Sequence, residues 1–375
     1  MKDFILQHYN DYPQSSLQDF FKFLYQGEFG PGHLIADPAK NFQYLQTEFE
    51  CLAVAPKEPI IDILDAHLCR LHLQVLSETT LNITTLQRFF EISAEELQGT
   101  VDGYYQKIQI LRDLCSNGDL PFNSVEVDEF KMKIDVDPTN PVHHSEAFRM
   151  AYQPAYRVVE KRFCDFLPLF AAIDQLRNEK EQVAIAIDGD CANAQKVTED
   201  RSKSVVIAID GDCAAGKTTL AKWLAQVYDC NVIHMDHFFL RPEQQTDKRL
   251  AMPGGNIDYE RFTSDVLQPL NAQKPFSYQP FNCRTQDFEA PISMIPKKLT
   301  IIEGSYSQHP ELAANYDLKV FLAIPEHVQL ERILKRNGEM MCEKFKNTWI
   351  PMEKRYAERF KIRENSHLQF DYLDA

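Results

Sequence analysis

Eight consecutive residues combine the chemical groups that a protein uses to bind phosphate. They run from position 211 to position 218 and read GDCAAGKT, which fits the pattern G-x-x-x-x-G-K-[ST]. In that pattern, backbone N–H groups surround the phosphates, the lysine reaches the β- and γ-phosphates, and the hydroxyl reaches Mg²⁺. We therefore expect Lys217 to contact a nucleoside triphosphate and Thr218 to contact the metal ion.

The residues on both sides of this loop have the patterns of the elements that must position it. A β-branched apolar run at 205–209 is typical of a buried parallel strand, and residues 219–225 are typical of a helix. Strand, loop and helix in this order direct backbone N–H groups and a helix N-terminus at the phosphates. A chance match in an unrelated loop is the alternative, and both flanks argue against it. The expected ATP-binding residues are Gly211, Asp212, Cys213, Ala214, Ala215, Gly216, Lys217, Thr218 and Thr219.

Two acidic residues farther along the chain each follow an apolar strand pattern. Asp236 follows the run at 231–235, and Glu303 follows the run at 299–302. Asp236 could accept a proton from a substrate hydroxyl and help to bind Mg²⁺, and Glu303 could bind the metal through water. The alternatives are a helix cap for Asp236 and a surface turn for Glu303.

The second half of the chain alternates strand patterns with helix patterns. A further strand is expected at 318–323, after those at 205–209, 231–235 and 299–302. This alternation predicts an α/β fold in which a doubly wound parallel sheet forms a P-loop domain over residues 205–375. Functional residues are expected at the carboxyl ends of the strands.

The half from about residue 205 onward resembles the uridine kinase and phosphoribulokinase family of P-loop kinases. The matching segments are the loop, VIHMDHFF at 232–239, NIDY at 256–259, IIEG at 301–304 and the arginine-bearing helix at 329–336. The resemblance implies ATP and Mg²⁺ as cofactors, Asp236 as the group that activates the acceptor hydroxyl, and Asp258 as a contact of sugar hydroxyls. It also implies that Arg332 and Arg336 embrace the transferred phosphate with their planar donor forks. A helix face with solvated arginines is the alternative for these two.

The sequence departs from the family in the segments that determine the acceptor. The loop has fewer glycine and serine residues, the lid lacks a dense arginine cluster, and YQPFNCR at 278–284 replaces the pyrimidine-recognition stretch. Tyr278 and Arg284 are candidate substrate contacts, and Arg284 could meet an anionic or polar group. We expect an ATP-dependent kinase that transfers the γ-phosphate to a hydroxyl of a nucleoside or related small molecule. A nucleoside monophosphate kinase and an ATP sensor with little turnover are the alternatives.

The first half of the chain, residues 1–180, is expected to form a mainly helical accessory domain. Apolar residues at helical spacing over 61–75 predict one helix, and a longer helical pattern begins at about residue 155. Residues 124–136 permit either a strand or a helix, because strict alternation competes with an acidic helix start.

Three histidine-bearing segments of this first half are candidates for a polar pocket. His33 follows a glycine-punctuated turn, His72 is expected on a helix, and His144 precedes a run that contains Tyr156 and Arg157. Together they could bind a metal or act in acid–base chemistry. Their spacing matches no metal-binding pattern, so helix capping and interhelical hydrogen bonding is the stronger alternative.

A near-exact repeat precedes the phosphate loop. Residues 183–192 read VAIAIDGDCA, and residues 205–214 read VVIAIDGDCA. The first copy continues with NAQK, so Gln195 stands where the second copy has Lys217. We expect a copy that cannot hold phosphate, at an edge of the sheet or outside it, within a junction at 181–204. A second, degenerate nucleotide loop is the alternative.

Composition excludes several classes of partner. The formal net charge of −15 argues against a nucleic-acid or anionic-membrane surface, because phosphate groups recruit basic patches. No apolar stretch approaches the roughly 20 residues of a membrane helix, and the first residues lack a signal-peptide pattern. Nine scattered cysteines without a C-x-x-C pair favour reduced thiols. We expect a cytoplasmic protein that binds a nucleotide and a small-molecule acceptor, with a homo-oligomer left open.

Overall fold

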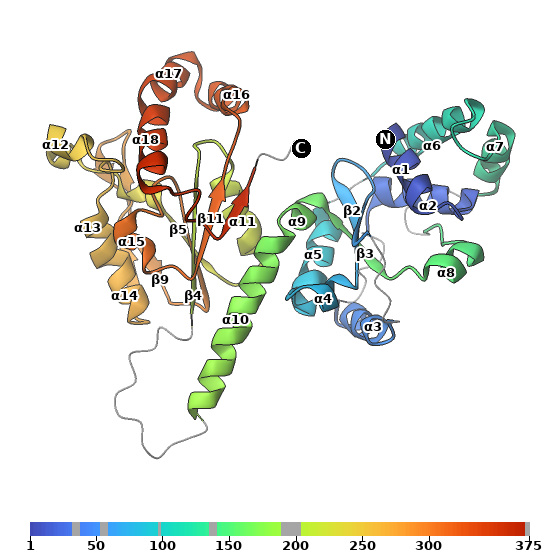
Figure 1. Ribbon diagram of the computed structural model, residues 1–375, viewed down its shortest axis with the longest axis horizontal. Coiled ribbons are helices and arrows are strands. Elements are labelled where there is room, and N and C mark those ends of the chain that lie inside the picture. Colours follow the sequence, from blue (N-terminus) through green and yellow to red (C-terminus); the bar gives the residue numbers. More distant parts are fainter. Residues whose placement is uncertain (32–37, 53–58, 97–98, 135–140, 189–203, 372–375) are drawn as a thin grey trace. The chain divides into compact units, whose positions relative to one another are not determined.

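The chain is divided into two compact units, each with its own sheet (Figure 1). The computed structural model describes residues 1–31, 38–52, 59–96, 99–134, 141–188 and 204–371. The first unit is Met1–Ala172 and the second is Ile173–Asp374. No helix of the described residues is both long and apolar enough to cross a membrane.

In the first unit, helices surround a three-stranded antiparallel sheet of order β1-β2-β3. The strands are β1 (Ile61–Ile63), β2 (Leu68–His72) and β3 (Tyr156–Glu160). The helices are α1 (Lys2–Asp11), α2 (Leu17–Phe29), α3 (Pro38–Glu50), α4 (Val75–Glu78), α5 (Ile83–Glu96), α6 (Val101–Ser116), α7 (Ser124–Lys133), α8 (Glu146–Tyr152) and α9 (Lys161–Asp165). The expectation of a mainly helical first half therefore holds, with a sheet added at its centre.

The helix predicted over residues 61–75 is wrong. The segment forms β1, β2 and the start of α4 instead. Strand β2 pairs with β1 on one side and with β3 on the other. All five of its residues are buried, so buried and exposed positions do not alternate along it. A strand that is buried on both faces has no alternating pattern, and its apolar residues can fall by chance at helical spacing.

The helical pattern that begins near residue 155 is interrupted. Its first part is strand β3, which pairs with β2, and the helices α9 and α10 (Leu167–Asp188) follow. Residues 124–133 form helix α7, which resolves the ambiguity in favour of the helix, because Asn123 and Glu126 form a reciprocal capping box.

The second unit is built on five parallel strands in the order β12-β11-β4-β10-β5. This confirms the predicted parallel α/β sheet. The strands are β4 (Val205–Gly211), β5 (Asn231–His234), β10 (Leu299–Glu303), β11 (Leu318–Leu322) and β12 (Leu368–Phe370). Strand β12 is short, half-exposed and at the edge, so its sequence carries little strand signal.

The remaining elements of this unit cover the sheet or extend from it. Two small hairpins pair β6 (Phe276–Tyr278) with β9 (Ile292–Met294), and β7 (Phe281–Asn282) with β8 (Asp287–Phe288). The helices are α11 (Lys217–Val227), α12 (Asp247–Leu250), α13 (Tyr259–Phe262), α14 (Gln268–Asn271), α15 (Pro310–Ala313), α16 (Glu326–Asn337), α17 (Glu339–Lys344) and α18 (Ile350–Phe360). Two short 3-10 helices are η3 (Met235–Phe238) and η4 (Pro242–Gln244), and two π-helical segments are η5 (Thr263–Leu267) and η6 (Phe345–Trp349).

Helix α10 crosses the boundary between the units at residue 172. Its second half is fixed to the second unit, because Tyr228 donates to Asp174 at 3.0 Å and Lys180 pairs with Asp317 at 2.8 Å. The first six residues of the first repeat copy, 183–188, continue this helix, whereas their counterparts form the central strand β4. The rest of that copy, with Gln195, lies outside the described residues.

The two copies differ in structure because their neighbours differ. Strand β4 lies between β10 and β11 and hydrogen-bonds to both, while the first copy extends an existing helix. Strand preference depends strongly on the partner strands that are present, so nearly identical residues can take either form. The expectation that the first copy forms a strand or loop beside the sheet is therefore wrong for 183–188.

Candidate functional site

The phosphate loop joins the central strand β4 to helix α11, as the sequence predicts. Lys217 is the first residue of the helix and is 8% exposed. Its Nζ donates to the carbonyl oxygens of Gly211 at 2.7 Å and Asp212 at 2.9 Å, and to Ser305 Oγ at 3.2 Å. The lysine is thus bound to its own loop by neutral acceptors, which a phosphate can replace.

Backbone geometry explains the glycines of this loop. Gly211 has a φ of +140°, and a Cβ there would lie 2.1 Å from the Leu322 carbonyl oxygen on the neighbouring strand β11. Gly216 has a φ of +102°. Ala214 is also in the left-handed region, with a φ of 62°, which a residue with a side chain adopts only at a cost. Such strain in a loop is typical of ligand-binding turns.

The outer side of the loop is held by residues that follow β11. The Asp212 carboxylate accepts from the backbone N–H of Ile324 at 3.0 Å, so it faces the end of β11. From helix α16, Gln329 donates to the Cys213 carbonyl at 3.0 Å and Arg332 donates to the Ala214 carbonyl at 3.1 Å. These bonds use carbonyl and carboxylate groups of the loop, so they do not themselves occupy its backbone N–H groups.

Two of the side chains expected to bind magnesium, Thr218 and Glu303, meet where β10 ends. Thr218 donates its hydroxyl to Glu303 Oε1 at 3.0 Å, and His234 Nδ1 contacts the same oxygen. The hydrogen bond to Glu303 raises the pKa of His234. Glu303 is 4% exposed, and the His234 imidazole and the Thr218 hydroxyl stabilise its buried carboxylate.

Asp236 lies directly after β5, in the turn η3, and its side chain is exposed to solvent. The surrounding protein and the nearby Glu303 carboxylate raise the pKa of Asp236, while the charges of Lys217, His234 and Arg336 oppose this rise. The sequence-predicted residues Lys217, Glu303 and Arg336 therefore lie within electrostatic range of Asp236.

The donor set at this position suits magnesium. Thr218, Glu303 and Asp236 offer hydroxyl and carboxylate oxygens, which are the ligands that Mg²⁺ prefers, with water and phosphate oxygens completing its shell. Within the described residues there is no cluster of three His, Cys, Asp or Glu side chains suited to a metal held by protein alone. A magnesium ion bound here would therefore depend on the phosphates of a nucleotide.

The two predicted lid arginines lie in helix α16 but have different surroundings. Arg332 holds the phosphate loop through its bond to Ala214. Arg336 is exposed, donates to Asn337 at 2.7 Å, and lies with its guanidinium carbon 6.0 Å from the centre of the Phe345 ring. Its charge reaches Asp236, so Arg336 fits the role of a phosphate-contacting group better than Arg332.

Asp258 has a structural task in the described state. One carboxylate oxygen accepts from the backbone N–H of Arg261 at 3.0 Å and caps helix α13, and the other accepts from Gln244 at 2.8 Å. The side chain is 3% exposed. A substrate hydroxyl would have to replace Gln244 to reach it, so its predicted role as a sugar contact stays a prediction.

Tyr278 and Arg284 come from the two small hairpins. The Tyr278 hydroxyl lies 3.3 Å from Nδ1 of His237, the residue after Asp236. Burial and the charge of His234 lower the pKa of His237 to about 4, so its imidazole is neutral near pH 7. Arg284 lies in the exposed β7–β8 turn.

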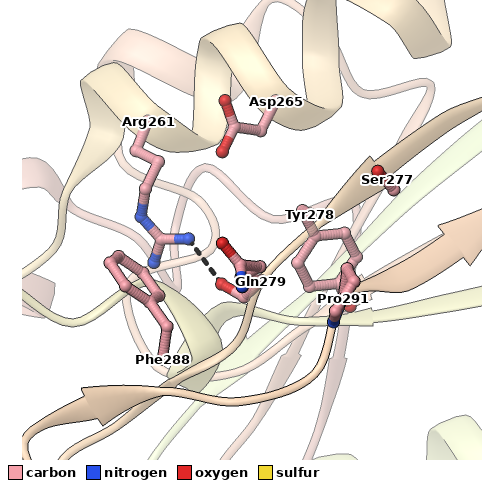
Figure 2. Close-up of a pocket in the computed structure, with 7 residues that line it drawn as sticks. All are labelled: Arg261, Asp265, Ser277, Tyr278, Gln279, Phe288 and Pro291. Atoms are coloured by element: carbon pink, nitrogen blue, oxygen red, sulfur yellow. Dashed lines mark hydrogen bonds between the residues drawn. The ribbon is translucent and has the colours of Figure 1, made fainter.

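A pocket of about 440 Å³ adjoins Tyr278 (Figure 2). Arg261 enters it from helix α13, donates to the carbonyls of Gln279 and His237, and stacks 4.2 Å from the centre of the Phe238 ring. The lining residues are Arg261, Asp265, Ser277, Tyr278, Gln279, Phe288 and Pro291. The lining does not include Lys217 or Asp236, so the pocket does not contain the phosphate loop or the expected catalytic acid.

Sequence reasoning missed four residues that shape the site: His234, Ser305, Asp210 and Glu353. His234 stands two residues before Asp236, and side chains two apart on a strand share a face, so its position could have been inferred. Asp210 is buried and accepts from Tyr356 at 2.8 Å and from three backbone N–H groups. Glu353 comes from a distant helix, and no local pattern indicates that it contacts the loop.

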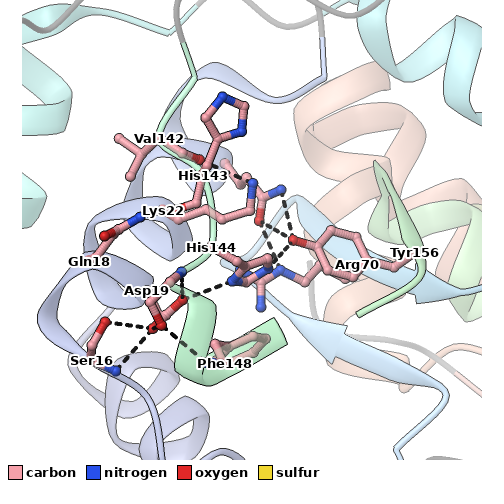
Figure 3. A network of polar contacts seen from close by, with 12 residues as sticks. Ser16, Gln18, Asp19, Lys22, Arg70, Val142, His143, His144, Phe148 and Tyr156 are labelled. Atoms are coloured by element: carbon pink, nitrogen blue, oxygen red, sulfur yellow. Dashed lines mark hydrogen bonds and ion pairs between the residues drawn. The ribbon is translucent and has the colours of Figure 1, made fainter. Parts of the chain in front are cut away.

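In the first unit the structure brings His144, but not His72, into contact with an acid on α2 (Figure 3). His144 Nδ1 lies 3.0 Å from Asp19 and its Nε2 lies 2.7 Å from the Tyr156 hydroxyl. Its ring stacks on Phe148 with centroids 4.1 Å apart, and burial lowers the pKa of His144 to about 4. The neutral imidazole thus links α2, the segment before α8, and β3.

His72 lies on strand β2, so its predicted place on a helix is wrong. Its Nε2 pairs with the Asp62 carboxylate at 2.9 Å, and the Tyr12 hydroxyl donates to the same oxygen at 2.7 Å. Arg70, beside it on β2, is fully buried, and its Nη atoms have no hydrogen-bond partner among the described residues. His33 lies outside the described residues, and Arg157 pairs with Glu48 at 2.8 Å.

These contacts make an interior polar network in the first unit. The orphaned Nη atoms of Arg70 have almost no accessible surface, so neither water nor a ligand reaches them. Stacking of this guanidinium at 4.8 Å from the centre of the Tyr156 ring compensates part of its lost hydration. The hydrogen-bonding alternative for these histidines therefore fits the geometry better than a pocket.

Comparison with known proteins identifies similarity of fold. No family model matches the chain, and no curated protein matches its sequence. Solved structures do match it. One described as a possible uridine kinase from Bacillus stearothermophilus is 19% identical, covering 52% of this chain and all of the other, with a TM-score of 0.33.

Two further solved structures are similar to the same part of the chain. D-glycerate 3-kinase from Cryptococcus neoformans is 14% identical over 48% of this chain and 87% of the other, with a TM-score of 0.31. Shikimate kinase from Bacteroides thetaiotaomicron is 18% identical over 44% and 85%, with a TM-score of 0.23. The assignment of a P-loop α/β fold rests on the parallel sheet and the loop themselves.

Proposed function

We propose that the second unit is an ATP-dependent kinase that transfers the γ-phosphoryl group to a hydroxyl of a small molecule. One observation carries this proposal. The adjacent parallel strands β4, β10 and β5 end at the same edge of the sheet and carry, in turn, the phosphate loop, Glu303 and Asp236. Ligands of open α/β sheets bind at this edge.

ATP binding would use groups that are already directed at the loop. Lys217 would exchange the Gly211 and Asp212 carbonyls for phosphate oxygens, which form stronger, charge-assisted bonds. Thr218 and Glu303 would hold Mg²⁺, which when bound neutralises part of the phosphate charge. The left-handed backbone at 214 and 216 shapes the turn whose N–H groups would surround the phosphates.

Asp236 would activate the acceptor hydroxyl by accepting its proton. Desolvation and the nearby Glu303 carboxylate raise the pKa of Asp236, so it is a better base than an ordinary aspartate. His234 holds Glu303, the neighbouring acid, in place. Arg336 would meet the charge that develops on the transferred group.

The acceptor is expected to bind next to the second hairpin. His237 follows Asp236 and contacts Tyr278, and Arg284 lies on the turn that follows β7. These side chains offer aromatic surface and hydrogen-bonding groups, as a nucleoside or a related polyol would need. The uridine-kinase-like assignment of the acceptor rests on sequence resemblance.

The decisive experiment measures ADP release from ATP and Mg²⁺ in the presence of nucleosides, sugars and small alcohols. We expect at least one hydroxyl acceptor to stimulate ADP release in the wild type and not in Asp236→Asn. Stimulation by nucleoside monophosphates alone would favour the monophosphate kinase. Tight ATP binding without stimulation by any acceptor would instead support a sensor and contradict the proposal.

A further inference from the structure

Helix α18 brings a carboxylate into contact with the phosphate loop. Glu353 Oε2 accepts from the backbone N–H of Cys213, the third residue of the loop, at 3.0 Å. Glu353 Oε1 accepts from the Ser305 hydroxyl at 2.8 Å. The amides of such loops attract anions, so an acidic side chain satisfies one of them while the loop is empty.

Ser305 connects this carboxylate to the phosphate lysine. The Ser305 hydroxyl donates its proton to Glu353 and receives a hydrogen bond from Lys217 Nζ at 3.2 Å. A hydroxyl has one proton to give, so Ser305 cannot donate to a phosphate while it donates to Glu353. The chain Lys217–Ser305–Glu353 therefore occupies two groups that lie at the phosphate site.

Other charged and titratable groups face Glu353 from the elements packed around it. Lys217 comes from α11, the Cys213 thiol from the loop, and Tyr306 from the segment after β10. Burial raises the pKa of Glu353, whereas Lys217 and the bonds from Ser305 and Cys213 oppose this rise. From α16, Arg332 is directed at the Ala214 carbonyl.

We propose that Glu353 takes up one proton from solvent when a nucleoside triphosphate enters the loop, and that this frees Lys217 and Ser305 for the phosphates. The proton binds to Oε1, which then donates to Ser305 Oγ. Ser305 in turn points its own proton away from Glu353, toward the bound nucleotide. Lys217 loses its serine partner, together with the Gly211 and Asp212 carbonyls, and donates to the phosphates instead.

Electrostatics fixes the direction of this coupling. The triphosphate adds negative charge next to Glu353. The positive charge of Lys217 moves from Ser305 toward the phosphates. Both changes disfavour the carboxylate and favour the neutral acid. Since the nucleotide-bound state then holds more protons than the free state, affinity must fall as pH rises between the two pKa values of Glu353, by at most about tenfold per pH unit.

The inference rests on the proposed ATP-binding function, and calorimetry of the full chain tests it. A nonhydrolysable ATP analogue with Mg²⁺ is titrated into the protein in two buffers of different ionisation enthalpy, which reveals protons exchanged on binding. We expect net uptake in the wild type and its loss in Glu353→Gln. Glu326→Gln is the control, because this exposed acid pairs with Lys354 outside the loop and its removal should leave the uptake unchanged.

Each result of the calorimetry either supports or overturns the proposed role of Glu353. Equal uptake in the wild type and Glu353→Gln overturns the role of Glu353 while leaving ATP binding intact. Absence of analogue binding by the wild type overturns the proposed function and this inference with it. Should Glu353→Gln fail to fold, the wild type alone suffices: a wild type that takes up no proton when it binds the analogue overturns the proposal.

Discussion

At the scale of single residues, the phosphate site is assembled from side chains that already have partners. Lys217 binds loop carbonyls, Thr218 binds Glu303, and Glu303 binds His234. A nucleotide would thus exchange one set of hydrogen bonds for another, and the net gain comes from charge. This makes charge-removing substitutions more informative than substitutions that change size.

Lys217→Ala should lower affinity for a nonhydrolysable ATP analogue by at least about tenfold, since hydrogen bonds to charged groups contribute about 1.5–3 kcal/mol. Titration calorimetry of the full chain gives the affinity. Gln195→Ala changes the matching position of the first repeat copy and should leave affinity unchanged. If both variants bound equally weakly, the first copy would also take part in nucleotide binding.

Asp236→Asn should lower acceptor-dependent ADP release by roughly 10²–10⁴-fold while nucleotide affinity stays close to wild type. The amide keeps the shape of the side chain but cannot accept the proton. Wild-type activity should fall as pH decreases through the pKa of Asp236, because the protonated acid is no base, and this fall should begin at a higher pH than for an ordinary aspartate. Full turnover by the asparagine variant would show that Asp236 acts only as a helix cap.

At the scale of elements, four of the five strands in the parallel sheet of the second unit could be predicted, and the strands of the first unit could not. Strands β4, β5, β10 and β11 are short apolar runs bounded by polar residues, which is a local signal. Strand β2 is equally apolar, but its leucines fall at helical spacing, and only its pairing with β1 and β3 makes it a strand. The pairing of β2 with β1 and β3 cannot be predicted from the residues of β2 alone.

The same distinction holds for the site. Lys217, Thr218, Asp236 and Glu303 are adjacent to strand ends, so their convergence follows from the order of elements. Glu353 reaches the loop from a helix whose own sequence gives no reason for it to point there. Contacts of this kind depend on packing between distant segments, which a single sequence does not specify.

Gly211→Ala should disrupt the second unit, because the added Cβ would lie 2.1 Å from the Leu322 carbonyl on β11. We expect loss of analogue binding and a lower thermal transition of that unit. Gly338→Ala is the control, since Gly338 also has a positive φ, of +78°, but has nothing within 4 Å of the added Cβ. Equal effects would show that backbone strain, and not the contact with β11, sets the requirement for glycine.

At the scale of the whole molecule, helix α10 is shared between the units. Residues 167–172 belong to the first, and the rest of the helix is anchored on the second through Asp174 and Lys180. Asp317 also accepts from the backbone N–H of Val206 at 2.7 Å, so this acid joins α10 to the start of the central strand. The helix is therefore part of the P-loop unit.

A fragment that begins at Ile173 should consequently unfold at a higher temperature than one that begins at Ser204. The longer fragment keeps the hydrogen bond of Asp174 and the ion pair of Lys180, both partly or fully buried. Calorimetry of the two purified fragments measures the difference, and Lys180→Ala in the longer one should remove part of it. Identical transition temperatures would show that α10 adds nothing to the second unit.

The bond between Cys213 and Glu353 joins positions that are 140 residues apart. During synthesis the phosphate loop leaves the ribosome long before its acidic partner, and also before Gln329 and Arg332, which hold its outer side. A nascent or truncated chain that ends before α18 can form β4 and the loop, yet it lacks the carboxylate that occupies the Cys213 amide. The proposed coupling between Glu353 and a bound nucleotide therefore requires that α18 has been synthesised.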